Sequence, residues 1–163
     1  MGKKLVLDAT PLIYLSKIRL WAHLHGFELL TTPQVLAEAG VSNDAFPEAA
    51  LIRQMLEAGG LKERLPEKTI HATKNLHEGE ASAISLAKHE NAVLVADDST
   101  ALAYAKSAGL KTAHSSTLLV RALKKRAISF SRAKQLLDEM IDEGWYCDVS
   151  TYKRVLAALE KYK

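Results

Sequence analysis

The chain has 163 residues and lacks several features that define whole classes of protein. Its single cysteine, Cys147, cannot form a disulfide within the chain. No apolar run approaches the roughly 18 residues that a membrane-spanning helix needs. No long apolar segment follows Lys3 and Lys4, which argues against a secretory signal. These absences predict a protein of the reducing cytoplasm with no membrane partner.

Several catalytic signatures are missing as well. No glycine-rich loop of the Walker or dinucleotide-binding type is present. The six histidines show no zinc-binding spacing such as HExxH, and no GxSxG motif marks a nucleophilic serine. There is no internal repeat and no low-complexity linker. Any chemistry must therefore be sought among other side chains, of which the carboxylates are the most distinctive.

Acidic residues are absent from one long stretch, although the net charge of the chain is only +3. No aspartate or glutamate occurs from Ser99 to Leu137, whose basic residues are Lys106, Lys111, Arg121, Lys124, Lys125, Arg126, Arg132 and Lys134. A surface of one charge sign favours polyanions. A solvated helical surface would have the same composition, so charge alone leaves both interpretations open.

Length and periodicity predict one α/β domain. A chain of this length can bury roughly 70% of its unfolded surface. Its composition, 48% apolar and 25% charged, is typical of a globular protein. Strands are predicted at 5–7, 27–31, 61–65, 92–96 and 111–113. Helices are predicted at 11–18, 33–39, 46–58, 78–89, 99–108, 116–126, 131–143 and 150–162, with a short helix or turn at 21–27.

Strands that alternate with helices need crossover connections, so the sheet should be mostly parallel and covered on both faces. The last two predicted helices have no strand between them. We therefore expect a domain at 1–126, followed by a helical extension at 127–163 that packs on the same domain as a hairpin.

Asp8 follows the first buried strand directly. Helix capping does not explain it, because Thr10 before Pro11 has the chemistry of an N-cap followed by proline in the first turn. Ligands of open parallel sheets bind beyond the carboxyl ends of the strands, where Asp8 should lie. Asp97 and Asp98 should lie at the same edge, after the strand at 92–96. One of these two is expected to cap the next helix, a role for which Ser99 competes.

Two glutamates are expected to point toward this edge from helices. Glu38 lies three residues after Val35 and should share its face, and Glu80 lies four residues before Ile84. An isolated carboxylate on a packing face is costly unless it is paired or bound to a metal. Ordinary alternatives remain open: Glu38 could pair with a lysine, and Glu80 could favour the helix N-terminus.

Carboxylates gathered in this way repel one another, and a divalent cation would relieve the repulsion. Sites made only of carboxylate oxygens suit Mg²⁺ or Mn²⁺, whereas zinc would favour cysteine or histidine. Magnesium held by a few carboxylates is typical of phosphate chemistry. The residues therefore predict a magnesium or manganese site for such a reaction.

Four segments, LVLDATPLIYL, TTPQVLAEA, HEGEASAISLA and VLVADDSTALAYAKSAGL, resemble the successive motifs of the PIN domain family. The resemblance covers about residues 5 to 126. It implies a three-layer α/β/α fold with a mostly parallel central sheet, and an endoribonuclease activity that depends on Mg²⁺ or Mn²⁺. It implies metal ligation by Asp8, Glu80, Asp97 and Asp98, with Glu38 as a further catalytic residue and Thr10 and Ser99 in support.

The chain departs from the family pattern at two positions. Glu80 stands where many members have aspartate, so this ligand would reach farther. Ala96 replaces a hydroxyl residue that is common just before the last acids, which leaves open whether Asp97 or Asp98 is the direct ligand.

The resemblance also implies partners. Many PIN nucleases are VapC-like toxins that a small antitoxin protein neutralises, and many form homodimers. We therefore expect an RNA substrate, the toxin role in a type II toxin–antitoxin pair, and an RNA path along Arg121, Lys124, Lys125 and Arg126. Two alternatives stay open. One is a non-catalytic PIN-like module that binds RNA or a protein, and the other is a receiver-like, Mg²⁺-binding signalling domain, whose acidic pair usually follows the first strand.

Overall fold

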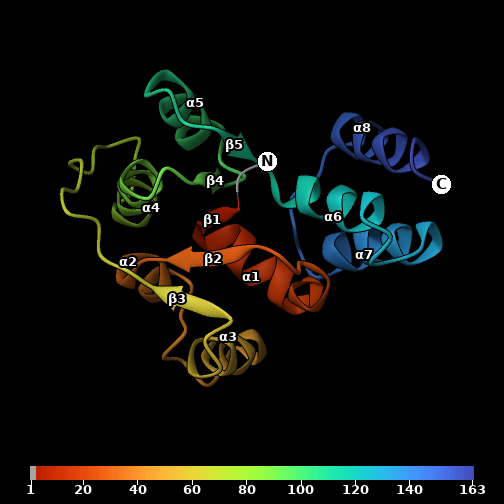
Figure 1. Cartoon of the computed structure of the whole chain (residues 1–163), viewed down its shortest axis with the longest axis horizontal. Coiled ribbons are helices and arrows are strands. Elements are labelled where there is room, and N and C mark those ends of the chain that lie inside the picture. Colours follow the sequence, from red (N-terminus) through yellow and green to blue (C-terminus); the bar gives the residue numbers. More distant parts are fainter. Residues whose placement is uncertain (1–2) are drawn as a thin grey trace.

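Five parallel strands form the central sheet in the computed structural model, which describes residues 3–163 (Figure 1). They are β1 (Lys4–Leu7), β2 (Glu28–Thr31), β3 (Leu61–Glu63), β4 (Val93–Val95) and β5 (Thr112–Ala113). Their order in the sheet is β3-β2-β1-β4-β5. The chain thus builds outward from β1 first on one side and then on the other. In open α/β sheets, the carboxyl edge beside such a reversal is where ligands bind.

Helices cover both faces of the sheet. They are α1 (Ala9–Lys17), α2 (Pro33–Glu38), α3 (Pro47–Glu57), α4 (Glu78–His89), α5 (Ser99–Ser107), α6 (Ser115–Lys124), α7 (Phe130–Asp142) and α8 (Val149–Glu160), with a short 3₁₀ helix at Leu20–His23. Helix α1 contacts α3 and α6, whereas α4 contacts α2 and α5 (Figure 1). The predicted α/β/α arrangement with a parallel sheet is confirmed.

The strands form where short apolar runs can be buried on both sides. Leu5, Val6 and Leu7 are completely buried, and the backbone of Leu7 pairs with Val95 on β4. Continuous apolar runs of this kind are typical of parallel strands covered on both faces. The pairing of Leu7 with Val95 brings the two segments that follow, which begin with Asp8 and Ala96, to the same edge of the sheet.

The first helix starts earlier than predicted. Helix α1 begins at Ala9, and the N–H of Leu12 donates to the carbonyl oxygen of Asp8 at 3.1 Å. The prediction that Thr10 caps this helix is wrong, because the chain enters the helix directly from β1 and Asp8 occupies the N-cap position. The Asp8 side chain makes no capping hydrogen bond. Outside the segment 21–27, the other predicted helices and strands are present with ends displaced by at most two residues.

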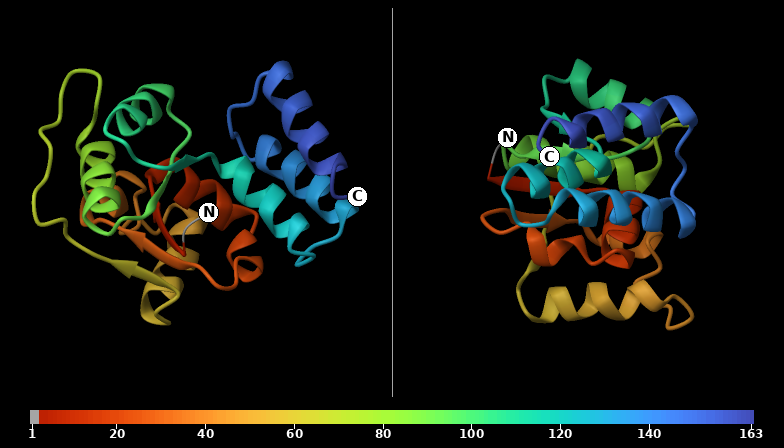
Figure 2. Two further views of the ribbon diagram at one scale, coloured as in Figure 1. Left: turned by 45° about the horizontal axis from the view of Figure 1, so that its top comes forward. Right: turned by 90° about the vertical axis from the view of Figure 1, so that its right-hand side faces the viewer.

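The helical hairpin of α7 and α8 packs on α6, and α7 also contacts α1 (Figure 2). Buried side chains of the hairpin, including Leu137, Met140 and Leu159, belong to the same hydrophobic core as the sheet. The predicted boundary after residue 126 falls between α6 and α7 and stays a prediction. None of the helices formed by residues 3–163 is both long and apolar enough to cross a membrane.

Candidate functional site

Asp8 is buried at the carboxyl end of the central strand. Its backbone N–H donates to the carbonyl oxygen of Val95 at 3.0 Å, which ties it to the neighbouring strand β4. Only 6% of the residue is exposed, and its Oδ1 is buried without a hydrogen-bond partner among residues 3–163. A buried carboxylate oxygen without a partner costs free energy, so its presence indicates a functional role for Asp8.

The surroundings of Asp8 disfavour its charge. Burial is the largest influence and, opposed by the backbone N–H of Ala9, it raises the pKa of the carboxyl group to about 7. The negative charges of Glu80, Glu38 and Asp97 contribute smaller parts of this rise. All three predicted partners therefore lie close enough to act on Asp8 electrostatically.

The two aspartates after β4 are used differently. The Asp98 side chain caps α5 by accepting a hydrogen bond from the N–H of Ala101 at 2.8 Å. The expectation that one of the pair caps this helix is confirmed, and the cap is Asp98 rather than Ser99. Asp98 is exposed, so its carboxylate is occupied with the helix terminus and open to solvent.

Asp97 is held by α6 and by the loop between α7 and α8. It accepts hydrogen bonds from the N–H and the hydroxyl of Ser115, at 2.9 and 2.6 Å, and from Nε1 of Trp145 at 3.0 Å. Nδ1 of His114 lies 3.7 Å from the carboxylate. Burial disfavours the charge of Asp97, but hydrogen bonding to His114, Ser115 and Trp145 outweighs it and holds the pKa below its usual range. Asp97 is thus a fixed, ionised carboxylate.

The two glutamates approach the site from α2 and α4. Glu38 was expected to point toward the packing face or its margin; it is exposed and lies at the margin, against Gly79 of α4. Helix α2 has only six residues and buries Val35 and Leu36, which leaves Glu38 beside the start of α4. Glu80 is half-buried, and its Oε2 accepts a hydrogen bond from the N–H of His77 at 2.9 Å. The role of Glu80 at the helix N-terminus, the ordinary alternative, is therefore present.

The backbone of Gly79, at the start of α4, orients the Glu38 carboxylate. The N–H of Gly79 donates to Glu38 Oε1 at 2.8 Å, and a Cβ atom at position 79 would meet the Glu38 carboxylate. A side chain at this position would displace the flexible end of Glu38 rather than the backbone.

Gly79→Ala is therefore expected to lower any activity that depends on Glu38, by roughly tenfold, the scale of losing a residue that orients a ligand. Alanine is the better helix former, so thermal stability should be equal or higher. Melting curves and rates of RNA cleavage measured on the same preparations test this. Unchanged cleavage would show that the position of Glu38 does not matter.

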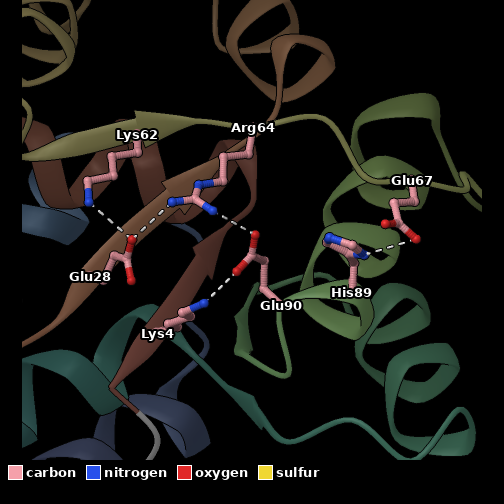
Figure 3. A network of polar contacts seen from close by, with 7 residues as sticks. All are labelled: Lys4, Glu28, Lys62, Arg64, Glu67, His89 and Glu90. Atoms are coloured by element: carbon pink, nitrogen blue, oxygen red, sulfur yellow. Dashed lines mark hydrogen bonds and ion pairs between the residues drawn. The ribbon is translucent and has the colours of Figure 1, made fainter.

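Other carboxylates of the chain are neutralised by cations. Glu28 pairs with Lys62 at 3.1 Å and Arg64 at 3.4 Å, and Glu90 pairs with Lys4 at 2.6 Å and Arg64 at 3.0 Å (Figure 3). Among residues 3–163, no lysine or arginine pairs with any of the candidate carboxylates, which are Asp8, Glu38, Glu80 and Asp97. The alternative that Glu38 pairs with a lysine is thus not what the structure shows.

The carboxylates fit a hard divalent cation by chemistry, although they do not enclose one. No three histidine, cysteine, aspartate or glutamate side chains of the described residues are arranged to hold a single metal ion. Glu38 and Glu80 are each turned to a backbone N–H, while Asp8 Oδ1 has no partner. All donors are carboxylate oxygens, the set that Mg²⁺ and Mn²⁺ prefer.

The predicted RNA-binding residues lie elsewhere. Arg121, Lys124, Lys125 and Arg126 lie at the C-terminal end of α6, whose ten residues span about 15 Å from the end that contacts Asp97. The Arg121 guanidinium lies 5.0 Å from the ring centre of Phe27, just before β2, and Lys124 lies 5.4 Å from that of Tyr162. Cations at a helix C-terminus also complement its dipole.

Sequence reasoning missed Ser115 and Trp145. The predicted helix started at residue 116 and so left Ser115 outside it. Trp145 lies 48 positions after Asp97 in a segment predicted to be only an appended hairpin. No periodicity or spacing connects residues so far apart. The one signal was a serine pair before an apolar run, which is typical of a helix N-terminus.

Comparisons with known proteins agree with this architecture. The DUF3368 family model, described as a PIN domain, matches residues 4–161. No curated protein sequence matches the chain. A solved structure of a PilT N-terminus domain protein from the archaeon Sulfolobus solfataricus P2 is similar, with a TM-score of 0.57 and 22% sequence identity. The match covers 74% of this chain and 94% of that chain, and at this identity it concerns the fold alone.

Proposed function

Because this chain belongs to the PIN domain family, we propose that it is a metal-dependent endoribonuclease that hydrolyses RNA phosphodiester bonds with Mg²⁺ or Mn²⁺. PIN domains are generally nucleases, which supports the reaction class. The observation that carries the proposal is Asp8: a buried carboxylate with an unpartnered oxygen, surrounded by three further acids and no pairing lysine or arginine among the described residues.

Asp8 and Asp97 would hold the ion, with Glu80 completing the set. A bound divalent cation supplies charge stabilisation at the phosphate and lowers the pKa of water. The protein's own contribution is orientation. Three hydrogen bonds from Ser115 and Trp145 fix the Asp97 carboxylate, as outer-shell partners of metal ligands commonly do.

Glu38 is placed to handle a proton. Its Oε1 is held by the N–H of Gly79, and its exposed side chain leaves Oε2 available to accept a proton from water at the scissile phosphodiester. Cleavage in which the 3′ oxygen leaves would give 5′-phosphate and 3′-hydroxyl ends. Asp98 has no direct role in this proposal, because its carboxylate caps α5.

The proposal is tested by cleavage of several structured RNAs. Cleavage should be lost in EDTA and restored by Mg²⁺ or Mn²⁺. Asp98→Asn should retain cleavage, because asparagine is as good an N-cap as aspartate. Activity that persists in EDTA would contradict metal dependence. RNA binding with no cleavage under any metal would indicate the non-catalytic alternative.

Toxin function, a small antitoxin partner and a homodimer are proposed on the family resemblance alone. Induced expression of the wild type in a bacterial host should then arrest growth, and Asp8→Asn should not. Equal growth of both strains, with both proteins soluble and expressed at the same level, would contradict the toxin role.

The basic end of α6 is proposed to contact RNA phosphates outside the carboxylate site. If it does, replacing Lys124, Lys125 and Arg126 together with glutamine should flatten the dependence of log K on log salt by up to roughly 0.7 per lost contact. Titrations of single-stranded RNA in EDTA at several salt concentrations measure this slope. An unchanged slope would mean that these cations only complement the helix terminus.

A further inference from the structure

A pocket of about 430 Å³ opens beside Asp97, between α6 and α8. The two helices lie side by side in the fold, and the hairpin of α7 and α8 thus forms one wall (Figures 1 and 2). Asp97 and Trp145 line the pocket, so the pocket shares one acid with the candidate metal site. Its volume is within the range of pockets that bind small ligands.

The pocket is lined by both apolar and polar residues. Val120, Val155 and Ala158 contribute apolar surface, while His114, Thr117 and Thr151 contribute hydrogen-bonding groups. A nucleobase matches this composition, because its faces are flat and apolar and its edges carry donors and acceptors. Proteins that recognise unpaired bases stack their faces on aromatic side chains and bind their edges through hydrogen bonds.

Tyr146 supplies an aromatic ring at the mouth of the pocket. The residue is 87% exposed, whereas its neighbour Trp145 is only 5% exposed and is hydrogen-bonded to Asp97. The buried tryptophan therefore anchors the loop at the acid site and leaves the tyrosine ring in solvent. Exposed aromatic rings beside a polar site are typical stacking platforms for single-stranded nucleic acid.

Arg154 adds a positive charge on the same side. Its Nη2 donates to the Thr151 hydroxyl at 3.0 Å, and it forms no ion pair among residues 3–163. A guanidinium with free donors binds phosphate or a base edge readily. The positive charge of Arg154 favours a negatively charged RNA strand as the occupant over a peptide with few acidic residues.

Building on the proposed function, we propose that this pocket binds one unpaired base of the RNA substrate, next to the phosphodiester at Asp8 and Asp97. The base would stack on Tyr146, and Arg154 would contact the adjoining backbone. A base within a duplex is already stacked and paired, and cannot enter. The C-terminal hairpin would thereby supply a base-binding subsite beside the proposed nuclease site.

Binding in the absence of cleavage tests this inference. The full chain with Asp8→Asn, in EDTA, is titrated with a fluorescent single-stranded RNA and with the same RNA in a duplex. Single strands should bind more tightly than the duplex. Adding Tyr146→Ala should weaken single-strand binding about tenfold, within the range of one lost base–aromatic stack. Tyr146→Phe, which keeps the ring, should bind more tightly than Tyr146→Ala.

Tyr104→Ala is the matched control. Tyr104 is also an exposed tyrosine, at 43%, but it lies on α5 and does not line the pocket, so its loss should leave binding unchanged. Equal single-strand affinity of the Tyr146→Ala protein, or equal binding of the duplex, would overturn the inference. A change in oligomeric state with unchanged RNA binding would also overturn it, and would assign the pocket to a second copy of the chain.

The two proposals fail separately. If the wild type cleaves RNA but Tyr146→Ala does not change the affinity for single-stranded RNA, the pocket inference is wrong and the nuclease proposal stands. If no RNA is cleaved but single-strand binding depends on Tyr146, the pocket stands and the nuclease proposal is wrong.

Discussion

Asp8→Asn is expected to lower the rate of Mg²⁺-dependent RNA cleavage by at least roughly 10²-fold, the scale of removing one electrostatic stabiliser. Asparagine has nearly the shape of aspartate, so the packing at the end of β1 should persist. An amide is neutral and is a weaker ligand for a hard cation. The loss should therefore come from the missing charge and not from unfolding.

Initial rates on one RNA substrate, at saturating Mg²⁺, measure this effect. Asp98→Asn is the matched control, because it makes the same chemical change at a carboxylate that caps α5 and is exposed. Cleavage by a highly purified Asp8→Asn protein at a rate near that of the wild type would remove Asp8 from the catalytic site.

The same substitution is expected to stabilise the metal-free protein above pH 7. The pKa of Asp8 is about 7 in the folded protein, compared with the ordinary aspartate value of 3.8 that applies in the unfolded chain. Between these pH values the folded protein holds a proton that the unfolded chain has released, so the free energy of unfolding falls as the pH rises. The full penalty is present above pH 7 and amounts to at most about 4 to 5 kcal/mol, at about 1.4 kcal/mol per pKa unit.

Asp8→Asn removes this penalty, because the amide does not ionise. Denaturant unfolding in EDTA, from pH 4 to pH 9, should show similar stabilities of the two proteins near pH 4. The variant should be increasingly more stable toward pH 8. A variant that is clearly less stable than the wild type at pH 8 would show that the Asp8 carboxylate serves the fold.

Added Mg²⁺ distinguishes a ligand from a merely buried acid. It should stabilise the wild type by roughly 2.7 kcal/mol at a hundred times its Kd, and the Asn variant much less. The effect should be larger at pH 8 than at pH 5, because protons compete with the ion for Asp8. Equal stabilisation of both proteins would place the ion elsewhere.

Local patterns in the sequence were sufficient for the architecture. The apolar runs at Leu5–Leu7 and in β4 predicted buried parallel strands, because such strands show a continuous apolar sequence when both faces are covered. Thr32 before Pro33 predicted the start of α2, and Thr32 does accept a hydrogen bond from Val35. Strand-end position alone also identified Asp8 and the Asp97–Asp98 pair, since the carboxyl ends of parallel strands meet at one edge.

Only the tertiary structure decided how these acids are used. Asp97 and Asp98 are adjacent and chemically identical, and they differ because residues 18 and 48 positions farther along the chain donate hydrogen bonds to Asp97. Glu38 is exposed because it lies about 200° around α2 from the buried Leu36, and Gly79, 41 positions away, holds its carboxylate. Periodicity describes neighbours within one helix or strand. It contains no information on which distant N–H group a carboxylate will meet, and that meeting determines the orientation and the pKa of the acid.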